Sequence, residues 1–415
     1  MNPDKMRKID ALAGPFICFA LSVRRGVLEK IWPRKKGKLE QIKRMLFVKP
    51  AEMGSTILMY SMLKRARELW PDIEFHFLVF AENAAAVKML GMVQEKNIHT
   101  LSTSDFKTFV CDSVMNLLRL RRLKFDVAID LEFFSRASAI LTELVGAKST
   151  CGFNRFTMEG LYKGNFFSHP VQYNAHIHTA QTFYSMIDAL LQPAGQIPLV
   201  KSVVAPLEEL QPPRLQISAE DQKEVKKLMR AENPKCFDQE KLIIINANSS
   251  ELVPLRRWPL EKFIELGREL LNAYSCTIVL TGVASERAES EKVEQALGRD
   301  RVCNMVGKTS LDQLLVLYSI CDLMITNDSG PSHFASLTDL AIITLFGPET
   351  PKLYGPLGRN KIAITANLAC SPCVSSYNHR ATPCNDNLCM KKIEVPVVLD
   401  ACRKLLNKAT RRISS

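Results

Sequence analysis

Short apolar runs alternate with segments of helical periodicity along most of this chain, starting at residue 45. MLFVK (45–49) and FHFLVF (75–80) predict strands, and the intervening segment 54–70 predicts a helix because its apolar residues recur at helical spacing. Alternation of this kind indicates parallel sheets with helices on both faces. The sequence therefore predicts the α/β class.

The alternation forms two series separated by a proline-rich stretch. The first continues through a helix at 106–123, the strand DVAIDLE (126–132) and a helix at 135–146, and the second runs from residue 242 to 347. Between them, residues 192–218 carry five prolines and little helical period, which places a hinge there. A chain of 415 residues is also too long for one ordinary core. We expect two doubly wound, Rossmann-like domains that face a cleft.

The expected organisation has five parts. A basic and apolar extension precedes two large domains, which a linker joins, and a basic helix ends the chain. Their ranges are 1–40 for the extension, 42–195 for the first domain, 196–240 for the linker, 241–395 for the second domain and 396–415 for the basic C-terminal helix.

Polar clusters follow five of the predicted strands. Ligands of doubly wound sheets bind at the carboxyl ends of the strands. The clusters are EMGST (52–56), DLE (130–132), NSS (248–250), TG (281–282) and NDSG (327–330). Their common location predicts a cleft enzyme with a phosphorylated ligand.

The stretch ITNDSGPSHFAS (325–336) predicts an anion site at the start of a helix. Pro331 suits the first helical turn because its missing N–H would be unpaired there. The free N–H groups of that turn, with the helix dipole behind them, can bind a diphosphate. The alternative is an ordinary capped turn between a strand and a helix.

Charge is concentrated at the two ends of the chain. Residues 1–44 hold twelve Lys or Arg against four acids, and five basic residues and no acid follow Asp400. The nearly neutral body argues against a nucleic-acid groove. The uncharged run 11–23, flanked by Lys5, Arg7 and Lys8 and by Arg24 and Arg25, is too short to span a bilayer comfortably. It predicts an interfacial or re-entrant anchor on an anionic membrane; the alternative is a helix that packs on the protein.

Several segments together resemble glycosyltransferase family 9, the ADP-heptose:lipopolysaccharide heptosyltransferases. They are residues 48–72, DVAIDLE followed by CGFNR, LRRWPLEKFIELGREL (255–270) and, most specifically, NDSGPSHFASLTDLAIITLFGPETPKLYGPLG (327–358). The resemblance covers about residues 42–410 and implies the two-domain GT-B fold, with an acceptor-binding domain at 42–195 and a nucleotide-sugar-binding domain at 241–395. It also implies inverting transfer of a heptose from ADP-heptose to a lipopolysaccharide core or similar lipid-linked saccharide. The scattered cysteines fit a reducing compartment, so we expect a cytoplasmic enzyme, peripheral on the inner face of the bacterial inner membrane.

The resemblance assigns donor binding to six positions. Arg256 stands where the family has lysine, and it can still form bidentate contacts with a diphosphate. The others are Glu286, Asp328, Ser329, Gly330 and His333. No D-x-D motif for a divalent ion is present in the sequence, so we expect no cofactor to be required for catalysis.

One position departs from the family pattern. The family commonly has aspartate, proposed as the catalytic base, where this chain has Ser55. Serine alone is not a general base near neutral pH, so Glu52 or Asp130 is the expected base, with Glu132 also nearby. Two alternatives stay open: a GT-B transferase of another sugar (a hexose or N-acetylhexosamine), and a non-catalytic nucleotide-sugar or saccharide-binding protein.

Four cysteines form a cluster near the C-terminus. Cys370, Cys373, Cys384 and Cys389 have the spacing C-x2-C-x10-C-x4-C in a loop rich in Pro, Asn and Ser. Four thiolates can hold a structural zinc ion. Unliganded thiols or disulfides are the alternative.

Overall fold

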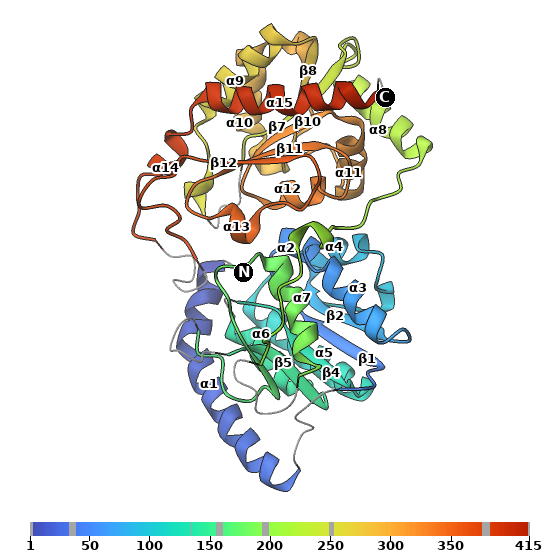
Figure 1. The fold of residues 1–415 in the computed structure, drawn as a ribbon, viewed down its shortest axis with the longest axis vertical. Coiled ribbons are helices and arrows are strands. Elements are labelled where there is room, and N and C mark those ends of the chain that lie inside the picture. The colour runs from blue at the N-terminus through green and yellow to red at the C-terminus, as the bar shows by residue number, and fades with distance from the viewer. Residues whose placement is uncertain are drawn as a thin grey trace. The chain divides into compact units, whose positions relative to one another are not determined.

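The computed structural model describes residues 3–32, 39–133, 135–154, 161–192, 199–248, 253–375 and 382–413. The chain divides into two compact units (Figure 1). Unit 1 contains the described residues up to Gln211, and unit 2 contains Pro212–Ser375 and the described residues from 382 onward. The boundary falls inside the segment 196–240 that was predicted to link two domains.

Unit 1 is built on a six-stranded sheet with the order β3-β2-β1-β4-β5-β6, in which all neighbouring strands are parallel. The chain therefore runs outward from β1 to one edge, returns, and continues from β4 to the other edge, as in a doubly wound fold. The strands are β1 (Arg44–Val48), β2 (Glu74–Phe80), β3 (Ile98–Leu101), β4 (Val127–Asp130), β5 (Ser149–Asn154) and β6 (His169–Gln172).

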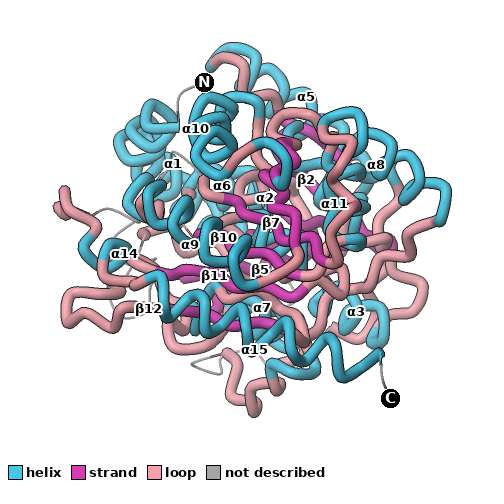
Figure 2. The backbone as a smooth tube through the Cα atoms, turned by 90° about the horizontal axis from the view of Figure 1, so that it is seen from above, coloured by secondary structure: helices cyan, strands magenta, loops and turns pink. Residues whose placement is uncertain are grey.

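Helices flank the strands of this sheet, as Figure 2 shows in cyan and magenta. Alternate strand residues such as Leu46 and Val48 pack with α5 and α6 in one apolar core. Helices α3 and α7 pack together elsewhere in the unit. The helices that follow the first strand are α2 (Met53–Ile57), α3 (Tyr60–Leu69), α4 (Ala84–Met89), α5 (Phe106–Leu123), α6 (Arg136–Leu144) and α7 (Thr179–Ala189).

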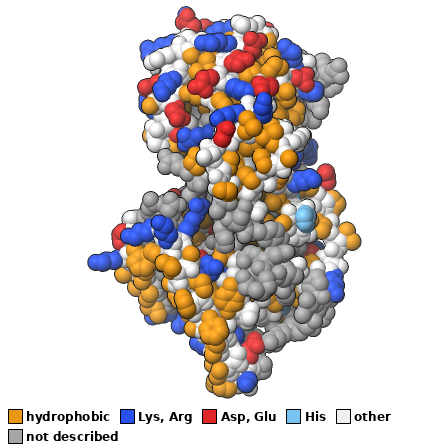
Figure 3. Space-filling view, turned by 90° about the vertical axis from the view of Figure 1, so that its left-hand side faces the viewer, with side chains coloured by type: hydrophobic (Ala, Val, Ile, Leu, Met, Phe, Trp, Pro, Cys, Tyr) orange, Lys and Arg blue, Asp and Glu red, His pale blue; other side chains and the backbone are white. Residues whose placement is uncertain are grey.

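The N-terminal helix α1 (Pro3–Ile31) lies along α6 and is fixed at both ends. Asp10 accepts hydrogen bonds from the backbone N–H groups of Arg136 and Ala137, both at 2.8 Å, which cap the start of α6. Near the other end, the Arg25 guanidinium donates to the buried Glu143 carboxylate at 2.9 Å. Cys18 is fully buried between these points. In Figure 3, hydrophobic side chains gather on the face of the unit that carries this helix.

Unit 2 repeats the architecture. Its parallel sheet has the order β12-β11-β10-β7-β8-β9. The chain again starts in the middle of the sheet at β7, runs to one edge at β9, and returns to β10 before it runs to the other edge at β12. Helices α9 (Leu260–Ala273) and α15 (Val395–Ile413) enclose the main apolar core against it. The strands are β7 (Lys241–Asn246), β8 (Cys276–Leu280), β9 (Val302–Asn304), β10 (Leu323–Asn327), β11 (Ala341–Phe346) and β12 (Lys361–Thr365). The other helices are α8 (Ala219–Glu232), α10 (Arg287–Leu297), α11 (Leu311–Ile320), α12 (Gly330–Ala335), α13 (Pro351–Tyr354) and α14 (Leu388–Lys391).

The α/β class, the two doubly wound domains and the N-terminal apolar helix are confirmed. One element needs correction: the single helix predicted over 54–70 is divided into α2 and α3. At the junction, Leu58 and Met59 donate to carbonyls three residues back, both at 3.1 Å, so the chain tightens into a 3₁₀-like turn. Helix α8 lies in the segment that was predicted to link the domains.

Candidate active site

The polar residues of each unit gather where the strand order reverses. In unit 1 this point lies between β1 and β4, and in unit 2 it lies between β7 and β10. In doubly wound sheets, ligands bind at the carboxyl ends of the strands at such a point. Five of the six predicted donor residues and both predicted bases follow one of these four strands; the exception, Glu286, follows the neighbouring strand β8.

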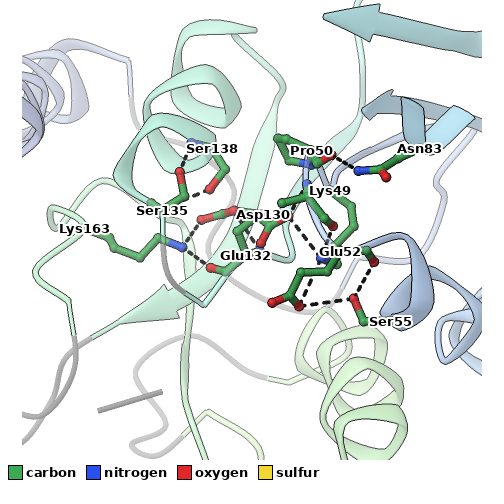
Figure 4. A network of polar contacts seen from close by, with 11 residues as sticks. Lys49, Pro50, Glu52, Ser55, Asn83, Asp130, Glu132, Ser135, Ser138 and Lys163 are labelled. Atoms are coloured by element: carbon green, nitrogen blue, oxygen red, sulfur yellow. Dashed lines mark hydrogen bonds and ion pairs between the residues drawn. The ribbon is translucent and has the colours of Figure 1, made fainter. Parts of the chain in front are cut away.

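In unit 1, a buried ion pair joins the loops after β1 and β4 (Figure 4). Lys49 is 1% exposed, and its Nζ donates to Glu132 Oε1 at 3.0 Å and to the Ala51 carbonyl at 2.6 Å. The same Glu132 oxygen accepts the Ala51 N–H at 2.8 Å. Burial raises the pKa of the Glu132 carboxyl, and the nearby Lys49 ammonium opposes that increase. The pair holds the first loop against the fourth strand.

Asp130, one of the two predicted bases, is fully buried at the end of β4. Its Oδ2 forms an ion pair with the buried Lys163 ammonium, which also donates to the Glu132 carbonyl. Its Oδ1 accepts the Glu132 N–H at 3.2 Å. Asp130 therefore supports the loop that carries Glu132, and its carboxylate is already engaged by a cation.

Glu52, the other predicted base, is the accessible carboxylate of the three, with 19% of its side chain exposed. Its backbone adopts the left-handed conformation (φ 65°), which costs a non-glycine residue about 1 kcal/mol. Its carboxylate lies 3.9 Å from Lys49 Nζ and 3.4 Å from the Ser55 hydroxyl, which makes a shorter bond of 2.9 Å to the Glu52 backbone carbonyl. Ser55, which replaces the family's aspartate, thus contacts a carboxylate that lies three residues earlier. Of the two candidates, the structure favours Glu52.

In unit 2, neutral amide side chains lie where the strand order reverses. The Asn327 side chain, fully buried at the end of β10, donates to the Ala247 carbonyl at 2.8 Å and accepts the Trp258 N–H at 3.0 Å. Asn246, at the end of β7, donates to the Thr281 carbonyl at 2.9 Å. These bonds connect the loops after three strands without adding charge.

Arg256 lies beside Asp328 in this network. It ends a 3₁₀ turn, Pro254–Arg256, and its Nη1 lies 3.5 Å from Asp328 Oδ2. Both side chains are largely buried. The Trp258 indole N–H donates to the Ile393 carbonyl at 2.9 Å, which fixes the segment just after Arg256. The structure thus places Arg256 beside the loop after β10, which carries the other predicted donor residues.

Three more predicted donor residues, Ser329, Gly330 and His333, lie at the start of α12. Ser329 precedes the helix in extended conformation, and its hydroxyl donates to the Asn327 carbonyl at 3.2 Å. Gly330 is the first helical residue, and His333 is buried one turn later. Ser329 makes no side-chain cap bond to the helix, Pro331 has no N–H, and the Ser332 N–H donates to the Ser329 carbonyl at 3.2 Å. The Gly330 N–H, at the start of the helix, is therefore the group placed to meet an anion.

Glu286 lies at the end of a 3₁₀ turn after β8 and accepts the Val283 N–H at 2.9 Å. Burial raises the pKa of its carboxyl, and the Val283 N–H, Arg257 and Asn248 oppose this increase. The interaction with Asn248 places Glu286 beside the loop that follows β7. It can therefore accept hydrogen bonds from a ligand at the same sheet edge as Arg256.

The four clustered cysteines are free thiols, and Cys389 is the buried member. Burial raises the pKa of Cys389, and the charges of Cys373, Cys384 and Cys370 raise it further. Across the ranges that the structure describes, no three His, Cys, Asp or Glu side chains are grouped to hold a metal ion. The structural zinc stays a prediction.

Two lysines of the unit 1 network were not among the predicted site residues. Lys49 is the last residue of the predicted strand MLFVK, and a lysine ending an apolar strand is a usable signal for a buried cation. Lys163 lies outside any helix or strand, and no pattern in the sequence connects it with Asp130. Only the fold brings these two together.

Comparison with known proteins agrees with this geometry. The model of glycosyltransferase family 9 (heptosyltransferase) matches residues 117–382. Lipopolysaccharide heptosyltransferase 2 of Salmonella typhimurium is 32% identical over 111 residues, which are 26% of this chain and 32% of that protein. Lipooligosaccharide heptosyltransferase 2 of Haemophilus influenzae is 23% identical over 318 residues, 75% of this chain and 86% of that protein.

Among solved structures, the Escherichia coli ADP-heptose lps heptosyltransferase II superposes with a TM-score of 0.66 at 18% identity, covering 88% of this chain and 99% of that one. This likeness shows a shared two-domain fold. The family match covers well over half of the chain, and its matched range includes every predicted donor residue. The chain therefore belongs to glycosyltransferase family 9.

Proposed function

We propose that this chain transfers a heptose from ADP-heptose, with inversion, to a lipopolysaccharide core or a similar lipid-linked saccharide. The proposal rests on the family and on the names of the relatives, which act on lipopolysaccharide or lipooligosaccharide. The similar E. coli enzyme is described with ADP-heptose in its name. No metal or other cofactor is required in this proposal.

The observation that carries the proposal is the junction between β10 and α12. There Arg256 lies 3.5 Å from Asp328, beside the first turn of α12. A guanidinium and the backbone N–H groups at the start of a helix can both bind phosphate oxygens. They can stabilise the negative charge that develops on a nucleoside diphosphate as it leaves. Glu286, at the same sheet edge, is the proposed contact to the nucleoside.

In the proposed reaction, an acceptor hydroxyl oxygen attacks the anomeric carbon of the donor sugar. The bond from that carbon to the diphosphate oxygen breaks, and ADP leaves with the electron pair. The hydroxyl proton passes to the Glu52 carboxylate, which is accessible, whereas Asp130 is paired with Lys163. The Lys49 ammonium, 3.9 Å away, favours the ionised form of the Glu52 carboxylate before the proton is transferred.

A donor panel tests the sugar and the nucleotide. The protein is incubated with ADP-heptose, a UDP-hexose or a UDP-N-acetylhexosamine and a lipid-linked acceptor, and release of ADP or UDP is measured with the product mass. We expect ADP and a heptosylated product. UDP release would establish the alternative hexose or N-acetylhexosamine transferase. Donor binding without any product would establish the alternative of a non-catalytic binding protein, which the replacement by Ser55 suggests.

The donor site has its own test. Asp328→Ala combined with Ser329→Ala removes the carboxylate beside Arg256 and the hydroxyl that precedes α12. We expect weaker ADP binding in calorimetry and lower turnover, because Asp328 positions the Arg256 guanidinium and the Ser329 hydroxyl can donate to a phosphate oxygen. Unchanged affinity and unchanged turnover would rule out the donor assignment.

The proposed location is the cytoplasmic side of the inner membrane, with α1 as the attachment. Lys5–Ile31 is long and apolar enough to cross a bilayer by length and composition. A spanning helix, however, would have to leave α6, to which Asp10 and Arg25 bind it. With its inner face on α6, the outer face still exposes Leu12, Phe16, Phe19, Val23 and Val27. We therefore propose that α1 lies in the plane of the membrane surface.

A further inference from the structure

Helix α5 carries an exposed apolar stripe that the sequence analysis did not identify. Phe106, Val110, Val114 and Leu118 recur every four residues, so they follow one another along the same side of the helix. They are 44%, 41%, 50% and 53% exposed, and the neighbouring Met115 is exposed as well. Isolated exposed apolar residues are ordinary, but a continuous stripe along a helix of eighteen residues marks an interaction surface.

The exposed charges on this helix are all positive. Lys107, Arg119, Arg121 and Arg122 are exposed on α5, and Lys124 is exposed at its C-terminal end. The acid of the helix, Asp112, is only partly exposed, and it accepts the Ser102 N–H at 2.9 Å. Asp105 caps the helix and accepts the Thr108 N–H at 3.0 Å. An apolar stripe with cations beside it is complementary to an anionic bilayer surface, which takes apolar side chains among its acyl chains and attracts Lys and Arg.

The position of α5 in unit 1 connects it with α1. Both helices pack against α6, which lies between them in the contact network of the unit. The Arg121 guanidinium donates to the Leu144 carbonyl at the end of α6, at 2.7 Å, so the two helices are tied together. The outward side of α1 exposes its own apolar row, with Phe16 at 78%. Two helices with apolar and basic outer sides therefore flank α6.

We propose that α5 is a second membrane-docking helix, which rests on an anionic bilayer together with α1. This inference rests on the proposed membrane association and deepens it. One helix lying in a surface leaves a protein free to rock about the helix axis. Two helices on either side of α6 define a plane. Unit 1 would therefore hold one orientation toward lipid-linked saccharides.

The test is vesicle flotation of the full chain with equal parts phosphatidylglycerol and phosphatidylcholine. Two independent variants of α5 are compared with the wild type: Val114→Asn with Leu118→Asn, and Lys107→Glu with Arg122→Glu. All four sites are exposed, so the fold has little reason to change, and circular dichroism checks it. We expect each variant to reduce vesicle partitioning by about tenfold or more. The effect of the charge variant should shrink as salt is added.

Matched controls separate this effect from a general loss of charge or apolar surface. Lys223→Glu with Lys227→Glu makes the same charge change on the exposed side of α8, and Val203→Asn with Val283→Asn removes exposed apolar residues elsewhere. We expect both controls to float like the wild type. A variant of α1, Phe16→Asn with Phe19→Asn, reports on the proposed attachment alone.

The outcomes distinguish the two proposals. If the α1 variant is released while the α5 variants bind like the controls, the α5 inference is wrong and the attachment through α1 stands. If the wild type does not float with these vesicles, both are wrong. If the wild type is a dimer that the α5 variants dissociate, with vesicle binding unchanged, α5 is a contact between two copies and the membrane inference is overturned. Release by the α5 variants and not by the controls supports it.

Discussion

The two units share one strand topology but differ in the side chains at the point where the strand order reverses. Each has six parallel strands in the same winding order, and each concentrates polar residues where the order reverses. In unit 1 these residues are buried ion pairs, Lys49 with Glu132 and Lys163 with Asp130. In unit 2 they are amides such as Asn246 and Asn327, with Arg256 and Asp328 at the border.

This difference in side chains indicates which step of the reaction each sheet edge can support. Two buried lysines neutralise two buried carboxylates in unit 1 and leave Glu52 as the accessible acid, which suits proton transfer. In unit 2 amides connect the loops, and the ion pair of Arg256 with Asp328 lies beside the start of α12, where the guanidinium can meet an anionic ligand. Equivalent strand ends thus support a base in one unit and a phosphate site in the other.

The largest expected effect separates Glu52 from Asp130. Glu52→Gln keeps the shape and removes the proposed base, so turnover should fall by about 10²–10⁴-fold with donor affinity unchanged. Asp130→Asn removes a carboxylate that Lys163 engages, so its main effect should be on the unfolding free energy. Steady-state kinetics and urea unfolding of both variants check this. Full activity of Glu52→Gln would move the base to another residue.

The next prediction removes a cation from unit 1. Lys163→Met leaves Asp130 buried without its partner, and breaking a buried pair in this way costs about 3–5 kcal/mol of unfolding free energy. The control is Lys148→Met, which removes an exposed ion pair to Asp126 and should cost less than about 1 kcal/mol. Urea unfolding measures both. Equal losses would show that the buried pair contributes no more than the exposed one.

A third change acts on unit 2. Arg256→Lys keeps the charge but loses the planar fork, which is the group that can bind two phosphate oxygens at once. ADP affinity measured by calorimetry should fall by about tenfold, close to the cost of one good charge-assisted hydrogen bond. Arg287→Lys, at an exposed pair with Glu291, should bind ADP like the wild type. Equal affinities would place the diphosphate away from Arg256.

The sequence predicted the layered fold well because strand and helix periods are local. The helix predicted over 106–123 matches α5 at both ends, and each strand end with a polar cluster lies at the carboxyl edge of a sheet. The choice between Glu52 and Asp130 could not be made from the sequence, because it depends on Lys163, 33 positions away from Asp130. The outward stripe of α5 could not be recognised either, since periodicity shows that a helix is amphipathic but not which apolar residues stay uncovered.

The smallest expected effect is a pH dependence built into the unit 1 sheet. His76 and His99 stack on neighbouring strands with their ring centroids 5.5 Å apart, and the two rings share a hydrogen bond of 3.2 Å. Burial, then His76 and Arg119, lower the pKa of His99 to about 4, and burial also lowers the pKa of His76 against the opposing charge of Glu74. Between pH 6.5 and about 4, the unfolded chain therefore binds protons that the folded chain does not.

Stability should thus fall as the pH decreases through that window and should be fully present above pH 6.5. Because His99 is partly exposed, we expect a loss of about 1 kcal/mol rather than the full value of the shift. Urea unfolding at pH 7 and pH 5 measures it, with His99→Gln as the variant that cannot titrate. A smaller pH dependence in His99→Gln than in the wild type assigns the loss to this pair. An identical dependence would assign it to the carboxylates of the ion-pair networks, and the contrast between the two units would then rest on those networks alone.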